Sequence, residues 1–323
     1  MNITFKFEFH IIVDKEKKNT ETASGSAENN SVKNMFLESA KAELDVLRTS
    51  LSMSTIENYK TALSAFKRYL GRDISIASIN KTVIKGFERW LRDKNVCLNS
   101  TSCYMRSLRS MLNRLDSENK TNAFEGTYTG RAKTEKRAVS ESDIVSIKKL
   151  QLRPFKFQSL VRDIFMFSYY ALGMPFVDVA FLRRSQINGN QLVYYRHKTG
   201  QRVVVPLEPC MLDIINRYNQ GGEYVFPILK SLDQQQAYKE YLHMLNRYNR
   251  SLKSLAKKAG LNIRLTSYTA RHTWASIAHA SNVDMPVISK ALGHTNTQTT
   301  LTYIKEINDD RLVEASRRII CRI

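Results

Sequence analysis

Apolar side chains recur every three or four residues between Met35 and Leu115, and this helical spacing constrains the fold more than any other feature of the sequence. It predicts three amphipathic helices. Their apolar faces are Ile56, Tyr59, Leu63, Phe66 and Leu70; Val83, Ile84, Phe87, Trp90 and Leu91; and, from Ser100 onward, Tyr104, Leu108, Met111, Leu112 and Leu115. With only 12 Gly and 6 Pro in 323 residues, the chain is too poor in turn residues for an all-β protein. Residues 35–117 are therefore predicted to form an all-α domain.

Local signals mark the ends of the first of these helices. Ser54 and Glu57 have the spacing of an N-terminal capping box, and Gly71 has the position of a C-terminal stop.

The segments on either side of the helical domain differ from it in composition. Residues 3–11 alternate apolar and polar side chains, which predicts one strand, and residues 14–31 are polar without a period, which predicts a flexible tether. Residues 1–34 thus form an N-terminal strand and tether. Residues 118–137 are polar and end in Arg131, Lys133, Lys136 and Arg137, which predicts a basic linker between domains.

A second domain, residues 138–323, mixes helices with a small amount of strand. Ser140 is placed to cap a helix, residues 157–173 predict a mostly buried helix, and two β-rich runs join at a hairpin turn over 198–201. Helices are expected over 211–219, over a long stretch ending at Gly260, and over the last stretch with breaks near 281–284 and Gly293. The predicted fold class is mainly α with a small β-sheet, an all-α domain followed by a mixed α/β domain.

The net charge points to a polyanionic partner. The chain holds 50 Lys and Arg against 30 Asp and Glu, a net charge of +20, which is typical of a protein that binds nucleic acid. Arg106, Arg109 and Arg114 share one side of the third helix and are candidate phosphate ligands, together with Arg131 and Lys133 of the linker. An ordinary solvated face is the alternative interpretation of these positions.

Other classes of protein are disfavoured. The four cysteines are scattered without a CxxC pair, so neither a zinc site nor a disulfide framework is expected, and the compartment is predicted to be reducing. No apolar run approaches the roughly 20 residues of a membrane span, and residues 1–19 lack the pattern of a signal peptide. We expect a soluble intracellular protein.

Side chains suited to phosphodiester cleavage gather in the last third of the chain. This reaction requires a nucleophile, cations for the phosphoryl oxygens and an acid for the leaving oxygen. Arg271 and His272 lie in YTARH, His294 follows a helix in LGH, Tyr303 comes nine residues later, and Lys198 lies at the hairpin. Each of them alone is more typical of surface or packing residues.

Together these motifs resemble the tyrosine recombinase, or phage integrase, family. RHTWAS followed by ALGHTNTQTTLTY is similar to the family's second-arginine box running into LGH and the nucleophilic tyrosine. The pieces FEGTYTGRAKTEKRAVS, FMFSYYALGMPFVDVAFL and SYTARHTWAS are most similar to the subgroup of Bacteroides-type mobile elements and DNA invertases. The resemblance implies that residues 35–117 are the core-binding domain and residues 138–323 the catalytic domain.

The resemblance also implies a role for each residue. Tyr303 would attack the scissile phosphate and form a 3′-phosphotyrosyl link, Arg271 and His294 would bind phosphoryl oxygens, and Lys198 would protonate the departing 5′-oxygen. Tyr268 stands where relatives carry His or Lys, beside Arg271. Because the covalent link conserves the phosphodiester energy, no ATP, metal or other cofactor is expected.

The first arginine box departs from the family pattern. Pro175 occupies the arginine position after Gly173, and proline cannot bind phosphate. Arg162 is a candidate substitute, although an ion pair with a nearby acid is the favoured interpretation. Asp178 is expected to fix a basic side chain, and His272 to be structural.

The expected function is site-specific DNA recombination by a bacterial, cytoplasmic protein that associates with the nucleoid when bound to DNA. The resemblance implies double-stranded DNA as substrate and a homotetramer assembled through the helix of residues 308–323, with accessory DNA-bending proteins as further partners. A non-catalytic DNA-binding derivative, favoured by Pro175, and a type IB topoisomerase are the alternatives. Integration, excision and inversion share one chemistry, and the sequence does not separate them.

Overall fold

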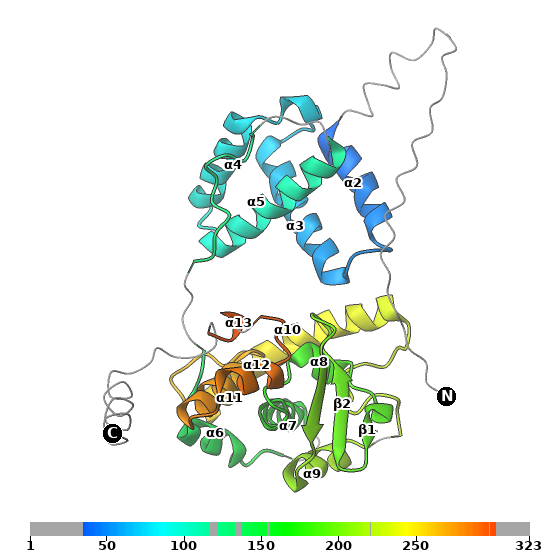
Figure 1. Ribbon diagram of the computed structural model, residues 1–323, viewed down its shortest axis with the longest axis vertical. Coiled ribbons are helices and arrows are strands. Elements are labelled where there is room, and N and C mark those ends of the chain that lie inside the picture. The colour runs from blue at the N-terminus through cyan, green and yellow to red at the C-terminus, as the bar shows by residue number, and fades with distance from the viewer. Residues whose placement is uncertain are drawn as a thin grey trace, which may run out of the picture. The chain divides into compact units, whose positions relative to one another are not determined.

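The computed structural model describes residues 35–116, 122–132, 137–153, 156–219, 221–296 and 298–301. The chain divides into two compact units, Met1–Lys133 and Thr134–Ile323 (Figure 1). The predicted strand and tether of residues 1–34, the nucleophile candidate Tyr303, the helix predicted over 308–323 and the linker residue Lys133 lie outside the described residues. The predicted fold class, mainly α with a small sheet, is confirmed.

The described part of the first unit is a bundle of four α-helices. These are α2 (Phe36–Leu47), α3 (Met53–Leu70), α4 (Lys81–Asp93) and α5 (Leu98–Leu115), with the 3-10 turn η1 (Ile76–Ser78) before α4. The last three are the helices that the apolar spacing predicts. Aromatic rings hold the core together, because the ring of Phe66 meets Phe36 edge-on at 5.7 Å and Phe87 at 5.1 Å.

The start of α3 differs from the predicted capping box. Ser52, not Ser54, is the N-cap, and its hydroxyl accepts a hydrogen bond from the Thr55 N–H at 3.3 Å. Glu57 instead pairs with Lys60 on the helix surface at 2.7 Å. The prediction was wrong because two serines compete for the same N–H groups, and the earlier one has the extended backbone that a cap requires. Gly71 ends the helix as predicted, with φ +72°.

Part of the segment predicted as a linker packs on the helical unit. Ala123 and Phe124 are buried in its core. The Arg109 guanidinium lies 5.4 Å from the centre of the Phe124 ring and donates to the Phe124 carbonyl at 3.0 Å. Further along, the Ser102 hydroxyl donates to the Gly130 carbonyl at 2.7 Å. Residues 122–132 are thus fixed to α5.

The second unit surrounds a short antiparallel sheet with helices. Its helices are α6 (Glu141–Lys148), α7 (Phe157–Tyr170), α8 (Phe176–Ala180), α9 (Pro209–Arg217), α10 (Gln234–Lys258), α11 (Thr269–Ala280), α12 (Met285–Ala291) and α13 (Gln298–Leu301), with the 3-10 turn η2 (Arg184–Gln186). Strands β1 (Ile187–Asn188), β2 (Gln191–Tyr195) and β3 (Arg202–Pro206) lie in the order β1-β2-β3. The hairpin β2–β3 is the predicted one, whereas the two-residue strand β1 is too short to leave an alternating pattern in the sequence.

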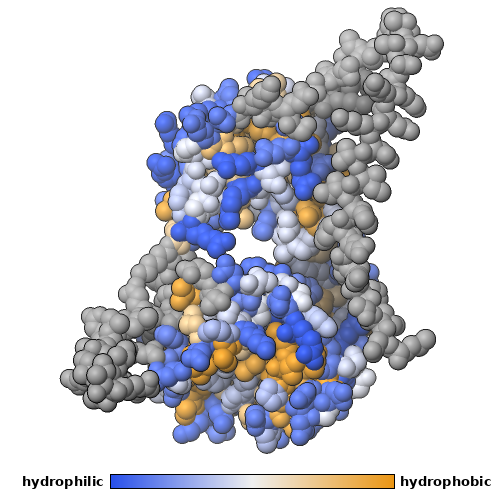
Figure 2. All heavy atoms as spheres, viewed as in Figure 1, coloured by the Kyte–Doolittle hydropathy of each residue, from blue (hydrophilic) through white to orange (hydrophobic). Residues whose placement is uncertain are grey.

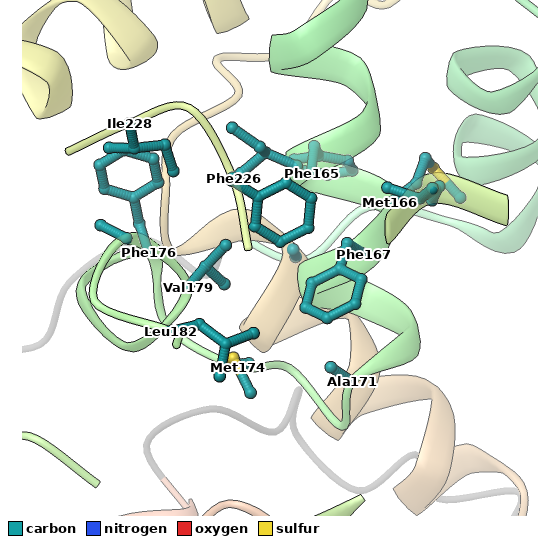
Figure 3. Packing of buried hydrophobic residues seen from close by; sticks show 14 of the residues in the cluster. Phe165, Met166, Phe167, Ala171, Met174, Phe176, Val179, Leu182, Phe226 and Ile228 are labelled. Carbon is teal, nitrogen blue, oxygen red and sulfur yellow. The ribbon is translucent and has the colours of Figure 1, made fainter. Parts of the chain in front are cut away.

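Helix α7 is the centre of this unit, and it contacts α6, α8, α9, α10 and α11 (Figure 1). Figure 3 shows Phe165 and Phe167 of α7 packed near Phe226, and the rings of Phe167 and Phe226 are 4.9 Å apart. Ala171 and Met174, in the loop that follows α7, and Leu182 belong to the same core. The loop at residues 171–175 is therefore anchored in the core by its own side chains. Among the described residues, no helix is both long and apolar enough to cross a membrane.

Candidate active site

Arg271 connects three segments that are far apart in the sequence. It lies in the first turn of α11 and its side chain is only 1% exposed. Its Nη1 donates to the Gly173 carbonyl at 3.0 Å, and its Nη2 donates to the Leu292 carbonyl at 2.5 Å. Gly173 has φ +69°, and a Cβ there would lie 2.9 Å from the Arg271 Cα, so only glycine fits at this contact. The box that contains Pro175 is thus in direct contact with Arg271.

His294 lies next to Arg271. Helix α12 ends at Ala291, and Gly293 then adopts the left-handed conformation, with φ +63°, which directs the chain back toward α11. Nε2 of His294 is 2.9 Å from Nη2 of Arg271, and Nδ1 is 2.9 Å from Oγ1 of Thr300. A guanidinium only donates, so Nε2 is the acceptor and Nδ1 carries the proton. Burial, followed by the charges of Arg271, Arg196 and Lys198, lowers the pKa of His294 to about 4, so the ring is neutral at pH 7.

Lys198 occupies the turn of the β2–β3 hairpin and is exposed. The turn is closed by hydrogen bonds from the Thr199 and Gly200 N–H groups to the Arg196 carbonyl. The Thr199 hydroxyl then donates to the Gly293 carbonyl at 3.0 Å, which ties the turn to the loop that carries His294. The structure therefore brings together Arg271, His294 and Lys198, three of the predicted site residues.

Tyr268 lies at the N-cap of α11, and 45% of its side chain is exposed. It lies close to Tyr241 of α10: burial, and then the proximity of Tyr268, raises the pKa of Tyr241 to about 12. His272, the neighbour of Arg271 on α11, is half-buried.

The predicted DNA ligands of the helical unit have different surroundings. Arg106 and Arg131 are exposed. Arg114 lies 3.7 Å from Glu43 and remains 42% exposed. Arg109 is occupied by its contacts with Phe124. Arg106 and Arg131 therefore have the surroundings that suit a phosphate contact best.

Arg162 forms the ion pair that sequence analysis favoured. Its guanidinium lies 2.8 Å from Asp163, and its Nη1 donates to the Leu150 carbonyl at 2.8 Å. Asp163 also accepts hydrogen bonds from the Arg217 guanidinium and the Tyr218 hydroxyl. Arg162 thus belongs to a structural cluster on α7.

Sequence analysis missed Arg196, the residue just after β2. Its side chain is 7% exposed, and its Nη1 donates to Asp178 of α8 at 2.5 Å. The other oxygen of Asp178 accepts from the His197 N–H at 2.8 Å, so Asp178 fixes a basic side chain, as expected. The signal that was overlooked is the alternation along β2, because Leu192 and Tyr194 are both buried and Arg196 continues the same face.

A basic groove lies elsewhere on the second unit, between α10 and the segment that leads into α11. Its volume is about 1150 Å³. Its lining carries four cationic side chains, those of Arg137, Arg250, Lys253 and Arg264, together with the amides of Asn246, Asn249 and Asn262. Cations and amide donors at one surface suit the phosphates of a nucleic acid backbone.

Comparison with known families decides the classification. One family model, the phage integrase SAM-like domain, matches residues 35–115, and another, the phage integrase family, matches residues 144–309, more than half of the chain. The chain belongs to the phage integrase family. The predicted membership is thereby confirmed.

Relatives within the family cover most of the chain. It is 23% identical over 272 residues to "Tyrosine recombinase XerC" of Rickettsia canadensis, which covers 80% of this chain and 88% of that protein. It is 24% identical over 281 residues to "Tyrosine recombinase XerD" of Shewanella oneidensis, covering 81% and 90%.

Solved structures share the fold. A lambda integrase dimer bound to a COC′ core site has a TM-score of 0.64 at 16% identity, covering 83% of this chain and 95% of that one. The Tn1549 transposon integrase in complex with transposon right end DNA has a TM-score of 0.64 at 13% identity, covering 88% and 100%.

Proposed function

We propose that this phage integrase family member is a site-specific DNA recombinase that cuts and rejoins strands through a 3′-phosphotyrosyl intermediate. The observation that carries the proposal is that Arg271 contacts His294, while the hairpin turn that carries Lys198 is bound through Thr199 to Gly293 and the charge of Lys198 acts on His294. Tyr303 is the proposed nucleophile, with Tyr268 as a hydrogen-bond donor at the edge of the site.

The proposed reaction breaks one P–O bond as it forms another. The Tyr303 hydroxyl gives up its proton to water as its oxygen attacks the scissile phosphorus. The bond to the 5′-oxygen breaks, and Lys198 transfers a proton to that oxygen as it leaves. Arg271 neutralises charge on the phosphoryl oxygens. The reverse attack by a 5′-hydroxyl restores the phosphodiester and the tyrosine.

The position of Thr300 supports Tyr303 in this role. The Thr300 hydroxyl contacts His294 at 2.9 Å, so the chain is already at the site three residues before Tyr303. Three residues span at most about 10 Å, so the length of the chain allows Tyr303 to act at this site.

The proposed substrate is duplex DNA, held in part through its backbone. Hydrophilic side chains cover much of the visible face of each unit in Figure 2. Arg106 and Arg131, together with Arg114 and Lys133, are the proposed phosphate ligands of the helical unit, whereas Arg109 is held by Phe124. The basic groove at Arg250 and Arg264 is a second such surface. Binding through these cations would weaken steeply with salt.

Strand exchange between two duplexes requires more than one copy of the protein. A lambda integrase tetramer bound to a Holliday junction shares this fold, with a TM-score of 0.64 at 15% identity. We propose a homotetramer in which residues 308–323 dock on a neighbouring subunit, with accessory DNA-bending proteins as further partners at the nucleoid.

Covalent capture tests the proposal and at the same time maps the target site. The full-length protein is incubated with sheared genomic DNA of its source organism, denatured with detergent, and the DNA bound to protein is sequenced at its ends. We expect adducts that map to defined positions and disappear in Tyr303→Phe. Adducts that persist in Tyr303→Phe, or no adduct at any site, contradict the proposal.

Pro175 favours one alternative, a DNA-binding protein without catalysis. Site-specific binding to the same DNA with no adduct would support that alternative. Adducts formed at sites without preference, with relaxation of supercoils by a single subunit, would instead indicate a topoisomerase.

A further inference from the structure

We propose that Arg196 supplies the phosphate-binding guanidinium that Pro175 cannot provide. The inference rests on the proposed function, because it assigns a ligand for the scissile phosphate of that reaction. Arg196 would bind a non-bridging oxygen and stabilise the charge that develops there, and it takes no part in proton transfer.

The location of Arg196 is the first support. It is paired with Asp178, which lies three residues after Pro175 on α8. Its stem packs on Gly293, where an added Cβ would lie 2.6 Å from the Arg196 Cγ. Gly293 is the residue before His294. Arg196 is therefore held between the box that lacks its arginine and the loop that carries the histidine.

The electrostatics agree with this location. Burial raises the pKa of Tyr194 well above its usual range, whereas the charges of Arg196 and Arg271 oppose the rise. The same two charges contribute to the lowered pKa of His294. Both guanidinium groups thus act on one small region, and two cations in one region are what a phosphoryl group with two charged oxygens requires.

The hydrogen bonding of Arg196 is the third support. Its Nε is fully buried and has no hydrogen-bond partner among the described residues. A buried donor without a partner is costly, and a bound ligand is one way in which such a group is satisfied. Asp178 accounts for Nη1, and Tyr194 is a further side-chain hydrogen-bond partner of the guanidinium. A purely structural ion pair leaves the Nε unexplained, whereas an anionic oxygen would satisfy it.

Arg271 alone is poorly placed to do this work. Three of the five N–H groups of its guanidinium already point to Gly173, Leu292 and His294. These contacts fix the orientation of Arg271. Because they occupy most of its N–H groups, a second cation is needed to bind the phosphate.

The test uses a duplex carrying the break site mapped by covalent capture, nicked so that the cleaved strand is trapped. Two versions are compared, one with the natural phosphate and one with a methylphosphonate, in which a neutral methyl group replaces a non-bridging oxygen. We expect Arg196→Ala to cleave the phosphate at least 100-fold more slowly than the wild type. On the methylphosphonate the deficit should shrink to within about tenfold, because the charge that needs the cation is absent.

The control is Arg162→Ala, which removes another paired arginine of the same unit but leaves Asp163 bound by Arg217 and Tyr218. It should cleave both substrates like the wild type. Because Arg196→Ala leaves a buried Asp178 unpaired, the double variant Asp178→Asn with Arg196→Met is measured as well. It contains no buried unpaired charge and should show the same pattern.

Each outcome is decisive. If both Arg196 variants cleave the phosphate substrate at the wild-type rate, the inference is overturned and the proposed function is unaffected. An equal loss of cleavage rate on both substrates also overturns the inference, because a merely structural role does not depend on the charge of the phosphoryl group. Failure of the wild type itself to form an adduct counts against the proposed function instead.

Discussion

Gly173→Ala tests whether the contact between Gly173 and Arg271 builds the site. Two costs add. The left-handed φ of +69° costs alanine about 1–2 kcal/mol. The new Cβ would also lie 2.9 Å from the Arg271 Cα, a backbone atom that cannot move cheaply, and overpacking of this kind costs about 1–3 kcal/mol. The expected total is about 2–5 kcal/mol of unfolding free energy.

Gly189→Ala is the matched control, since Gly189 has φ +55° with nothing within 4 Å of the added Cβ. It should lose only the backbone cost, about 1–2 kcal/mol. Both variants are made in a Trp90→Phe background, so that Trp274 on α11 alone reports urea unfolding of the second unit. Equal urea midpoints for the two variants would refute the steric argument, because they would mean that the Arg271 backbone shifts at little cost.

Three further outcomes follow from the same contacts. Asp178→Ala should lower the unfolding free energy by about 3–5 kcal/mol, read from Trp274, because it leaves a buried guanidinium unpaired; a loss below about 1 kcal/mol would contradict this. His294 should titrate near pH 4 by NMR. Since its unfolded pKa is higher, its contribution to stability is complete above about pH 6.5 and declines as the pH falls toward 4, a slope that His294→Gln should reduce. Arg109→Ala should destabilise the helical unit by about 1–3 kcal/mol, whereas Arg106→Ala should weaken DNA binding without that loss, and the reverse order would contradict the assignment.

Local sequence signals predicted the features that depend on neighbours in the chain. Gly71 ends α3, Ser140 caps α6, and the turn at Gly200 joins β2 to β3, all as expected. Each depends on backbone preferences within four or five residues, which the sequence displays directly.

Features that depend on distant partners were not predictable in this way. Arg196 and Asp178 are 18 residues apart, and nothing local shows that a buried strand end will place one against the other. The choice of Ser52 over Ser54 depended on which of the two has the extended backbone of a cap, and in the folded chain that residue is Ser52. The grouping of Arg271, His294 and Lys198 came from resemblance to a family, and the contacts that produce it became visible only in the folded chain.

The acceptors of Arg271 lie in two stretches of the chain, at Gly173 and at Leu292–His294, so its side chain fastens these two stretches and its own helix α11 to one another. Anyone who swaps loops to redirect this protein toward new DNA sequences must transplant those stretches as a set. An exchange that alters a single stretch would unfasten the other two, and the hybrid would recognise its new target without being able to cut it.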